Sequence, residues 1–424
     1  MTLGRALATL RVPEAAEVLA PQWADSEACL PTGLPGFLTC WSIVQAREFA
    51  GLSPQADPEL LEAARRIAAS RCLRQLAWHC TRLLYYHLDY QAQRIAKWPD
   101  LTGTLGELAG AFYLLIALEA VPRMRAVHAE RGIPEAITRD TCSHFPESVR
   151  IFREQHGGRV GVRPHVLYWL RHHTQGEIYR LGRHEYMVKP FRGPLEVYRH
   201  RPSRQVVALA ASDTRFDEQG YVARPDSPDG WCAELARQGA GVTGYPIAPC
   251  GRAVRRRVVL PRQEWERALV PGDPVLEMHI PAGGEMTPGR CRDSMEQALR
   301  FFPLYLKERP FVGFACGSWI LNPELETIYR SDSNMVLWQR EVYLFPILCG
   351  DRSGLYFVFG RDDVDPATAP RDTSLRRALL DHLSAGGRLL AGGMFVLLDD
   401  FARYGTQLYR RQWPAVAARL GVGE

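Results

Sequence analysis

Residues 275–302 read VLEMHIPAGGEMTPGRCRDSMEQALRFF, and they predict a strand, a loop and a helix in that order. Its first six residues, 275–280, alternate between apolar and polar side chains, which is typical of a half-buried strand. A loop containing Gly283 and Gly284 follows. Thr287 suits the N-cap of a helix and Pro288 its first position, so a helix is predicted from there. Its buried side is predicted to carry Cys291, Met295, Ala298 and Phe302.

The chain before this stretch changes its periodicity once. Helical spacing of apolar residues predicts helices at 58–69, 71–90, 109–120, 146–155 and 166–172. Period-two alternation then predicts strands at 177–181, 184–189, 195–200 and 205–210. Gly182-Arg183 lies between the first two strands and suits a two-residue hairpin turn. A short helix is predicted at about 231–237.

After residue 302 the pattern mixes strands and helices. Strands are predicted at 311–316, 341–345, 355–359 and 394–398, and a helix at 374–383. The fold class is therefore α+β: a helical domain at 1–172, followed by a mixed sheet with covering helices at 173–424.

Composition excludes several classes of protein. The chain has 424 residues, 46% of them hydrophobic and 23% charged, which excludes a disordered or collagen-like protein. Only three of its 52 basic residues are lysines, and its 47 acidic residues are scattered among the 49 arginines. Without a basic tail or stripe, the net charge of +5 does not predict a nucleic-acid partner.

Targeting and redox features point to the cytoplasm. Glu14 and Glu17 fall where a signal peptide would be apolar. The longest apolar run, Ala109 to Leu118, is half the length of a membrane span, so we expect a buried helix and no membrane partner. The ten cysteines lack CxxC pairs and are expected to be reduced, without a metal site. The phosphate-loop, dinucleotide-binding and nucleophile-elbow motifs are also missing.

Strand 275–280 carries the first candidate for chemistry. Its alternation places Glu277 and His279 on one side of the sheet, roughly 7 Å apart along the strand. A histidine beside a carboxylate is a plausible general base. The alternative is a polar sheet face covered by solvent or by an ion pair, which is the more common situation.

The loop after this strand is the candidate site for a phosphate group. Gly283 and Gly284 allow a ligand to approach the backbone, and the free N–H groups at a helix start near Thr287 bind anions. An ordinary strand–helix connection is the alternative, and the neighbouring Glu285 counts against a phosphate.

Two other segments are candidate ligand sites. Cys316, Ser318 and Trp319 lie at a predicted strand end, where they either contact a ligand or form part of the core. The order Cys-Gly-Ser-Trp differs from the papain-type signature, since Trp319 stands where that signature has its nucleophile. The arginines of 252–257 form either a solvated strand edge, which is favoured, or a patch for an acidic ligand.

Several segments together resemble a bacterial family of acyltransferase-domain proteins. They are WLRHHTQGEIYRLGRHEYM (169–187), HIPAGG (279–284), DSMEQALRFF (293–302), FACGSWILNPELE (314–326), SDSNMVLWQ (331–339) and GGMFVLLDDFARYGTQLYR (392–410). The resemblance covers about residues 35–410. It implies an N-acyltransferase-type helical N-terminal domain and a C-terminal domain like that of the GCN5-related N-acetyltransferases (GNAT).

The resemblance also implies a reaction and a site. Its donor is acyl-CoA and its acceptor a small-molecule amine, with the cofactor at Gly283, Gly284 and Thr287. In this fold the pantetheine arm inserts where two central strands, here 275–280 and 311–316, splay apart. His279, aided by Glu277, is then the expected base, and Cys316, Ser318 and Trp319 line the acceptor pocket.

The chain departs from the family pattern at two places. Its loop lacks the Q/R-x-x-G-x-G/A pattern of related acetyltransferases, and Gly317 stands where the family commonly has a histidine. These departures keep open a non-catalytic small-molecule binding protein on a GNAT-like fold. A hydrolase using His279 and Ser318 is a third hypothesis. The oligomeric state is not predicted from the sequence.

Overall fold

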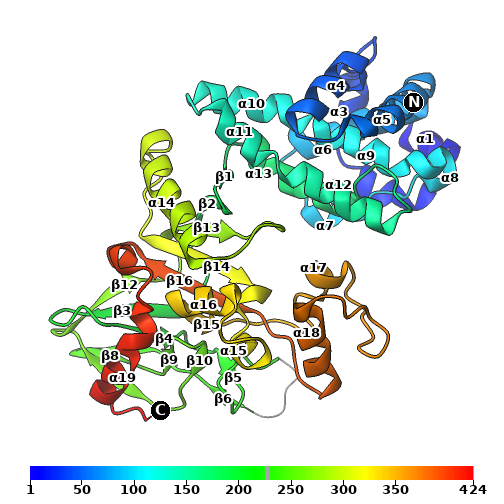
Figure 1. Ribbon diagram of the computed structural model, residues 1–424. Helices are drawn as coiled ribbons and strands as arrows, with labels where there is room; N and C mark the ends of the chain where they lie inside the picture. Colours follow the sequence, from blue (N-terminus) through cyan, green and yellow to red (C-terminus); the bar gives the residue numbers. More distant parts are fainter. Residues whose placement is uncertain (225–229, 424) are drawn as a thin grey trace. The chain divides into compact units, whose positions relative to one another are not determined.

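The computed structural model of the chain describes residues 1–224 and 230–423. It contains two compact units, Met1–Leu181 and Gly182–Glu424. The first consists mainly of helices, and the second of sheets with helices around them (Figure 1). The predicted domain break after residue 172 falls in α13, close to the boundary between the units, and the division into domains 1–172 and 173–424 stays a prediction.

The first unit consists mainly of α-helices, joined by turns, longer loops and short 3-10 helices. The α-helices are α1 (Leu3–Thr9), α2 (Ala16–Leu19), α3 (Trp23–Ala28), α4 (Cys40–Phe49), α5 (Asp57–Ala69), α6 (Arg71–Tyr85), α7 (Ala92–Ile95), α8 (Thr102–Leu105), α9 (Ala109–Leu118), α10 (Ala120–Glu130), α11 (Glu135–Thr141), α12 (His144–Gln155) and α13 (Leu170–Thr174). The short strand β1 (Tyr179–Leu181) ends the unit.

Helix α9 forms the centre of this unit, as its sequence predicts. All its residues from Gly110 to Leu118 are buried, so its apolar side chains face neighbouring helices on every side. The longer stretch Thr102–Glu130 is apolar enough to cross a membrane, but 72% of its most apolar window is buried within the structure. Burial of this kind is expected of the core helix of a globular unit.

A buried arginine ends α6 earlier than the sequence predicts. The guanidinium of Arg171 is 3% exposed and donates to the carbonyls of Leu83 and Leu84, at 2.7 and 2.9 Å. It also donates to carbonyls in the following turn, including that of Tyr90. Carbonyls at a helix C-terminus lack partners within the helix, and a cation there is stabilised by the helix dipole. Arg171 therefore stabilises the chain reversal after α6.

Strands of the second unit form one main sheet and smaller ones beside it. The main sheet runs β2 (His184–Pro190), β13 (Pro274–His279), β14 (Gly313–Ser318), β16 (Gly392–Leu397) and β15 (Tyr343–Pro346). A second sheet runs β10 (Arg252–Ala253), β9 (Pro246–Ala248), β4 (Val206–Ala210), β3 (Leu195–His200) and β12 (Trp265–Leu269). The others are β11 (Val258–Pro261), β8 (Gly241–Gly244) and β7 (Ala236–Gln238), and the pair β5 (Arg215–Phe216) and β6 (Trp231–Cys232).

Helices of the second unit are α14 (Pro288–Tyr305), α15 (Leu325–Ile328), α16 (Asn334–Glu341), α17 (Leu355–Phe359), α18 (Ser374–Ser384) and α19 (Leu408–Leu420). Helix α14 packs on β2, where Ser294 Oγ accepts from the backbone N–H of His184 at 3.0 Å and bonds the hydroxyl of Tyr186 at 2.9 Å. The predicted buried side of α14 is confirmed, since Cys291, Met295, Ala298 and Phe302 are all buried.

Two of the predicted elements are wrong. Residues 231–237 form β6 and the start of β7, because Trp231 pairs with Phe216 and stacks near the rings of Phe216 and Tyr245. Residues 355–359 form the single helical turn α17, between Gly354 and Gly360, whose φ angles are 91° and 76°. A short apolar run does not distinguish a strand from a buried helical turn by periodicity.

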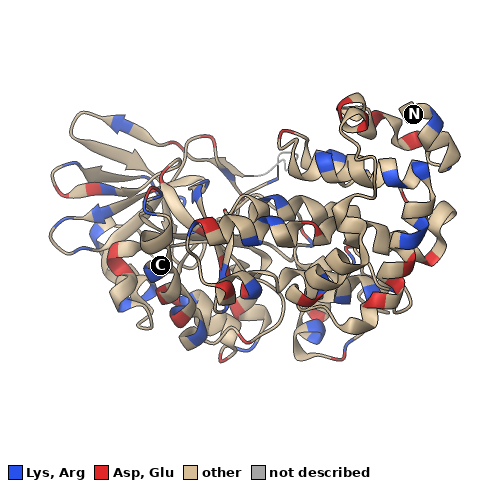
Figure 2. Ribbon diagram, turned by 90° about the horizontal axis from the view of Figure 1, so that it is seen from above, with Lys and Arg blue, Asp and Glu red and all other residues tan. Residues whose placement is uncertain are grey.

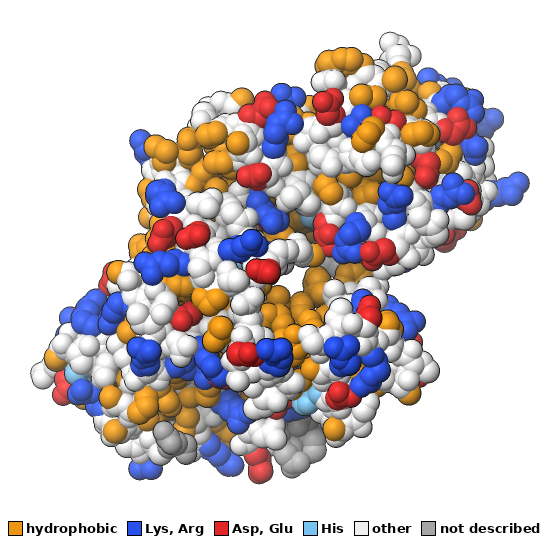
Figure 3. Space-filling model, viewed as in Figure 1, with side chains coloured by type: hydrophobic (Ala, Val, Ile, Leu, Met, Phe, Trp, Pro, Cys, Tyr) orange, Lys and Arg blue, Asp and Glu red, His pale blue; other side chains and the backbone are white. Residues whose placement is uncertain are grey.

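Charged residues of both signs are spread over the described residues. Figure 2 shows Lys and Arg beside Asp and Glu along the helices, and Figure 3 shows them interspersed on the face it presents. On α5, for example, Glu62 accepts from both Arg65 and Arg66. Such exposed pairs contribute little to stability individually.

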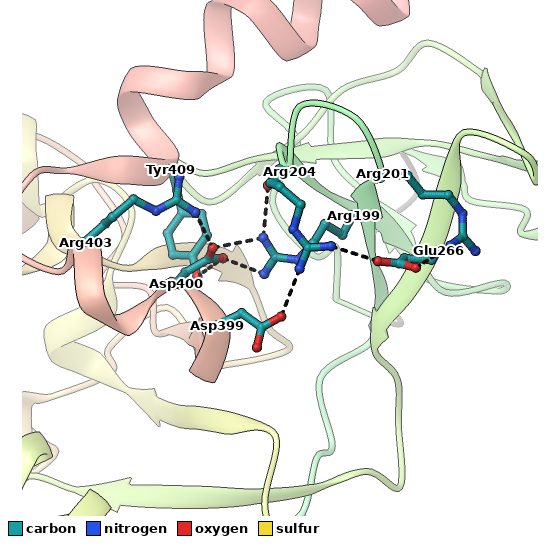
Figure 4. Close-up of polar contacts among 8 residues, drawn as sticks. All are labelled: Arg199, Arg201, Arg204, Glu266, Asp399, Asp400, Arg403 and Tyr409. Atoms are coloured by element: carbon teal, nitrogen blue, oxygen red, sulfur yellow. Dashed lines mark hydrogen bonds and ion pairs between the residues drawn. The ribbon is translucent and has the colours of Figure 1, made fainter.

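One ion pair is different, because it is buried. Arg199 on β3 donates through both terminal nitrogens to the carboxylate of Asp400, each at 2.9 Å, and the two side chains are 3% and 1% exposed (Figure 4). Tyr409 and Arg403 also donate to this carboxylate, at 3.1 and 2.7 Å. Asp400 lies in the turn directly after β16, so the pair joins the main sheet to the second sheet.

We predict that Asp400→Asn lowers the free energy of unfolding by about 3–5 kcal/mol, because it leaves the Arg199 charge buried without a counter-charge. Asp399→Asn is the matched control: its side chain is 68% exposed and pairs with the exposed Arg204, so we expect a loss under about 1 kcal/mol. Urea unfolding of both variants measures the difference. Equal losses would contradict a special role for the buried pair.

Buried imidazoles in the first unit give a second prediction. Burial lowers the pKa of His128 to about 4 and that of His173 to about 3, from 6.5, and both side chains are at most 1% exposed. The folded state therefore favours their neutral forms. The free energy of unfolding is therefore unaffected by these histidines above pH 6.5. It falls as the pH drops from 6.5 towards 4, by about 1.4 kcal/mol per pH unit for each histidine, because the unfolded state binds the proton more readily.

Urea unfolding of the wild type at pH 7, 6 and 5 measures this slope, and His173→Gln should reduce it by the share of one histidine. A wild-type stability that is constant from pH 7 to 5 would contradict the prediction.

Candidate active site

The main sheet opens between its two central strands. β13 and β14 run parallel and pair only at Leu276↔Phe314 and Glu277↔Ala315. Beyond these pairs β13 stays with β2 as far as His279↔Glu185, and β14 stays with β16 as far as Ser318↔Gly392. The carboxyl ends of β13 and β14 thus diverge. His279 of β13 and Ser318 of β14 lie beyond the paired positions, whereas Glu277 occupies one of them.

Glu277 and His279 lie on the same side of the sheet, as the alternation predicts. Their neighbours Leu276 and Met278 are at most 1% exposed and face the opposite side, while Glu277 and His279 are half-buried. The register adds a residue that sequence reasoning missed. Glu185, 4% exposed, is the cross-strand partner of His279.

The strand register places Glu185 closer to His279 than Glu277 is. Directly opposite residues of antiparallel strands have Cβ atoms about 5 Å apart, against roughly 7 Å for residues two apart on one strand. The sequence does indicate that Glu185, Met187 and Lys189 lie on one side of a strand. It did not identify Glu185, because the partner strand and its register are unknown from sequence.

The loop after β13 has the backbone that its glycines suggest. Gly283 and Gly284 are exposed and have φ angles of 76° and 73°, a region that other residues rarely adopt. Thr287 Oγ1 accepts from the backbone N–H of Arg290 at 3.3 Å, so it is the predicted N-cap of α14. The helix start beside the glycines therefore presents backbone N–H groups and the positive end of a dipole.

Arg183 lies against this loop and was also missed. Its Nη1 donates to the carbonyl of Pro281 at 2.9 Å, and a Cβ at Gly284 would lie 3.7 Å from its Cδ and Nε. Arg183 comes from the turn before β2, where Gly182 has the positive φ expected of a hairpin, 67°.

The residues at the end of β14 have distinct surroundings. Burial, and to a smaller extent the charge of Glu277, raises the pKa of Cys316 to about 12, so it is a neutral thiol at pH 7 and a poor nucleophile. Ser318 Oγ accepts from the backbone N–H of Ile320 at 3.3 Å and caps the following turn. The Trp319 ring packs against Gly354, where a Cβ would come within 2.7 Å of it.

Gly317 leaves open space on the side of the sheet that carries Glu277. A Cβ built there would meet only Ile347 Cδ1, at 3.8 Å, so a larger residue fits the backbone at this position. Its cross-strand partner is Gly393, where a Cβ would lie 2.2 Å from the Phe345 ring.

No group of three or more His, Cys, Asp or Glu able to hold a metal ion occurs among residues 1–224 and 230–423.

Comparison with known proteins agrees with the two-part organisation. The GNAT-like C-terminal domain family matches residues 178–395, over half of the chain, and the N-acyltransferase N-terminal domain family matches residues 42–176. Comparison with curated protein sequences gives no match.

Solved structures share the fold of the chain. A mutant acyltransferase in complex with octanoyl-CoA is 21% identical, with a TM-score of 0.64, over 94% of this chain and 100% of that one. An acyltransferase in complex with decanoyl-CoA and teicoplanin is 21% identical, with a TM-score of 0.53, over 84% and 98%. The α+β, GNAT-like prediction of the fold is confirmed.

We predict opposite effects of alanine at the two paired glycines. Gly317→Ala should leave stability unchanged or raise it by up to about 1 kcal/mol, because a strand glycine is replaced where space exists. Gly393→Ala should lower stability by about 1–3 kcal/mol, because the Phe345 ring must move. Thermal unfolding compares the variants, and equal destabilisation would contradict the described packing around Gly317.

Proposed function

The chain belongs to the GNAT-like C-terminal domain family, and on this premise we propose that it is an N-acyltransferase that moves an acyl group from acyl-CoA to an amine on a small-molecule acceptor. The observation that carries the proposal is the divergence of β13 and β14 after their two paired positions. In the family's fold such an opening admits the pantetheine arm of the donor. Strands paired along their whole length would have favoured the alternative of a binding protein.

The proposed donor site follows from the loop and helix at the end of β13. Backbone N–H groups at Gly283, Gly284 and the Thr287-capped start of α14 suit the pyrophosphate of acyl-CoA. The loop of this chain lacks the Q/R-x-x-G-x-G/A pattern. Arg183 supplies a positive charge beside the loop. The donor, when bound, supplies the acyl thioester.

The proposed base lies at the opening. His279 accepts the proton of the acceptor amine as the amine attacks the thioester carbonyl. The C–S bond then breaks, and the CoA thiolate leaves and takes up the proton from the imidazolium. Glu185 and Glu277, across the ladder and along the strand, favour the protonated imidazole that results. Neutral Cys316 contributes to the wall, while Ser318 and Trp319 shape the acceptor side of the pocket.

Features outside this site support the chemical class and the location. The similar structures were obtained with octanoyl-CoA, decanoyl-CoA or teicoplanin bound, which supports a CoA donor and a small-molecule acceptor. All ten cysteines are free, which suits the reducing cytoplasm.

Calorimetric titration with octanoyl-CoA tests the donor site. We predict saturable binding to the wild type, weakened at least about tenfold by Gly284→Val, because a β-branched residue opposes the positive φ and fills the approach to the backbone. Gly132→Val is the matched control, since Gly132 is also exposed and has a φ of 69° in the first unit. No binding to the wild type would overturn the proposal.

Release of free CoA thiol with a panel of small amines tests catalysis. His279→Ala should retain octanoyl-CoA binding and reduce thiol release by about 10²–10⁴-fold, as for loss of a general base. Glu185→Gln should give a smaller loss than His279→Ala. Binding of octanoyl-CoA without amine-dependent thiol release would favour the non-catalytic binding protein, and full activity of His279→Ala would remove the assigned base.

A further inference from the structure

An open cleft of about 500 Å³ lies in the second unit, away from the β13–β14 opening. One wall comes from β3 and β12, with Tyr198 and Trp265, and the other from β7, β8 and β11, with Val242 and Leu260. None of the residues proposed to bind acyl-CoA lines it. The cleft therefore needs an explanation separate from the proposed acyl transfer.

Positive charge in this cleft exceeds negative charge. Arg201, Arg237, Arg262 and Arg267 line it, and Glu266 is the only acid among the described lining residues. Arg201 donates to Glu266 at 2.7 Å.

Arg237 pairs with Glu196, which lies just outside the lining and also accepts from the Tyr198 hydroxyl. These two acids leave a net charge of about +2 on the cleft, as counted from formal charges.

The excess comes from two exposed arginines on neighbouring segments. Arg262 directly follows β11 and Arg267 lies within β12. Neither forms an ion pair with a carboxylate of residues 1–224 or 230–423. Each guanidinium has several N–H donors in a planar fork that matches the oxygens of phosphate.

We propose that this cleft binds a ligand that carries a phosphate monoester on an apolar group. The phosphate, a dianion near neutral pH, matches the charge that Arg262 and Arg267 leave uncompensated. The apolar group contacts Val242, which is partly exposed in the lining, while Leu260 and Trp265 are buried beneath it. A solvated arginine surface is the ordinary alternative, and it predicts no saturable site.

Calorimetric titration of the full chain with phenyl phosphate tests the proposal. We expect saturable binding that is weakened at least about tenfold in the Arg262→Ala/Arg267→Ala double variant, since charge-assisted hydrogen bonds to phosphate are lost. Arg255→Ala/Arg256→Ala is the matched control, because these arginines are also exposed but lie outside the cleft. The control should change the affinity less than about twofold.

Three results would overturn the proposal. The first is the absence of saturable binding, and the second is equal weakening by both double variants. The third is that inorganic phosphate binds as tightly as phenyl phosphate, which would show that the apolar group contributes nothing to binding. Arg183→Ala separates this site from the proposed donor site. It should weaken octanoyl-CoA binding and leave phenyl phosphate binding unchanged, so the two proposals can fail independently.

Discussion

The short parallel ladder between β13 and β14 is the constraint on which the site depends. Two paired positions hold the strands together, and the ladders to β2 and β16 then draw their ends apart. Gly392 and Gly393 allow this at β16. A Cβ at Gly392 would lie 2.0 Å from the Leu321 carbonyl, and the Phe345 ring occupies the space at Gly393. The absence of a side chain at Gly392 therefore allows the turn after β14 to lie against β16.

The buried Arg199–Asp400 pair fixes the other side of this arrangement. Asp400 follows β16 directly, and the Tyr409 hydroxyl bonds both this carboxylate and the backbone N–H of Leu397 at the end of β16. A buried ion pair is weak evidence for net stability, because desolvation of both charges opposes their attraction. Its geometric effect is clearer, since the bidentate contact holds the end of β16 in one position against β3.

Local signals in the sequence predicted much of the fold, whereas contacts distant in sequence were missed. The Thr287 cap, the buried side of α14 and the alternation in β13 are properties of neighbouring residues, and all were predicted. Glu185 and Arg183 reach the site through strand pairing and packing, which the sequence does not state. The predictions for 231–237 and 355–359 were wrong. Aromatic packing determines the structure of the first segment, and two flanking glycines determine that of the second.

Register converts this scattered set of residues into one site. Glu277 and His279 lie on one side of β13, and Leu276 and Met278 are buried on the other side. Side chains alternate with a period of two, so a slip of β13 by one residue would bury both polar groups. The burial of Leu276 and Met278 therefore selects the register. The same register places Glu185 opposite His279, and the glycine loop then leads from β13 to the start of α14.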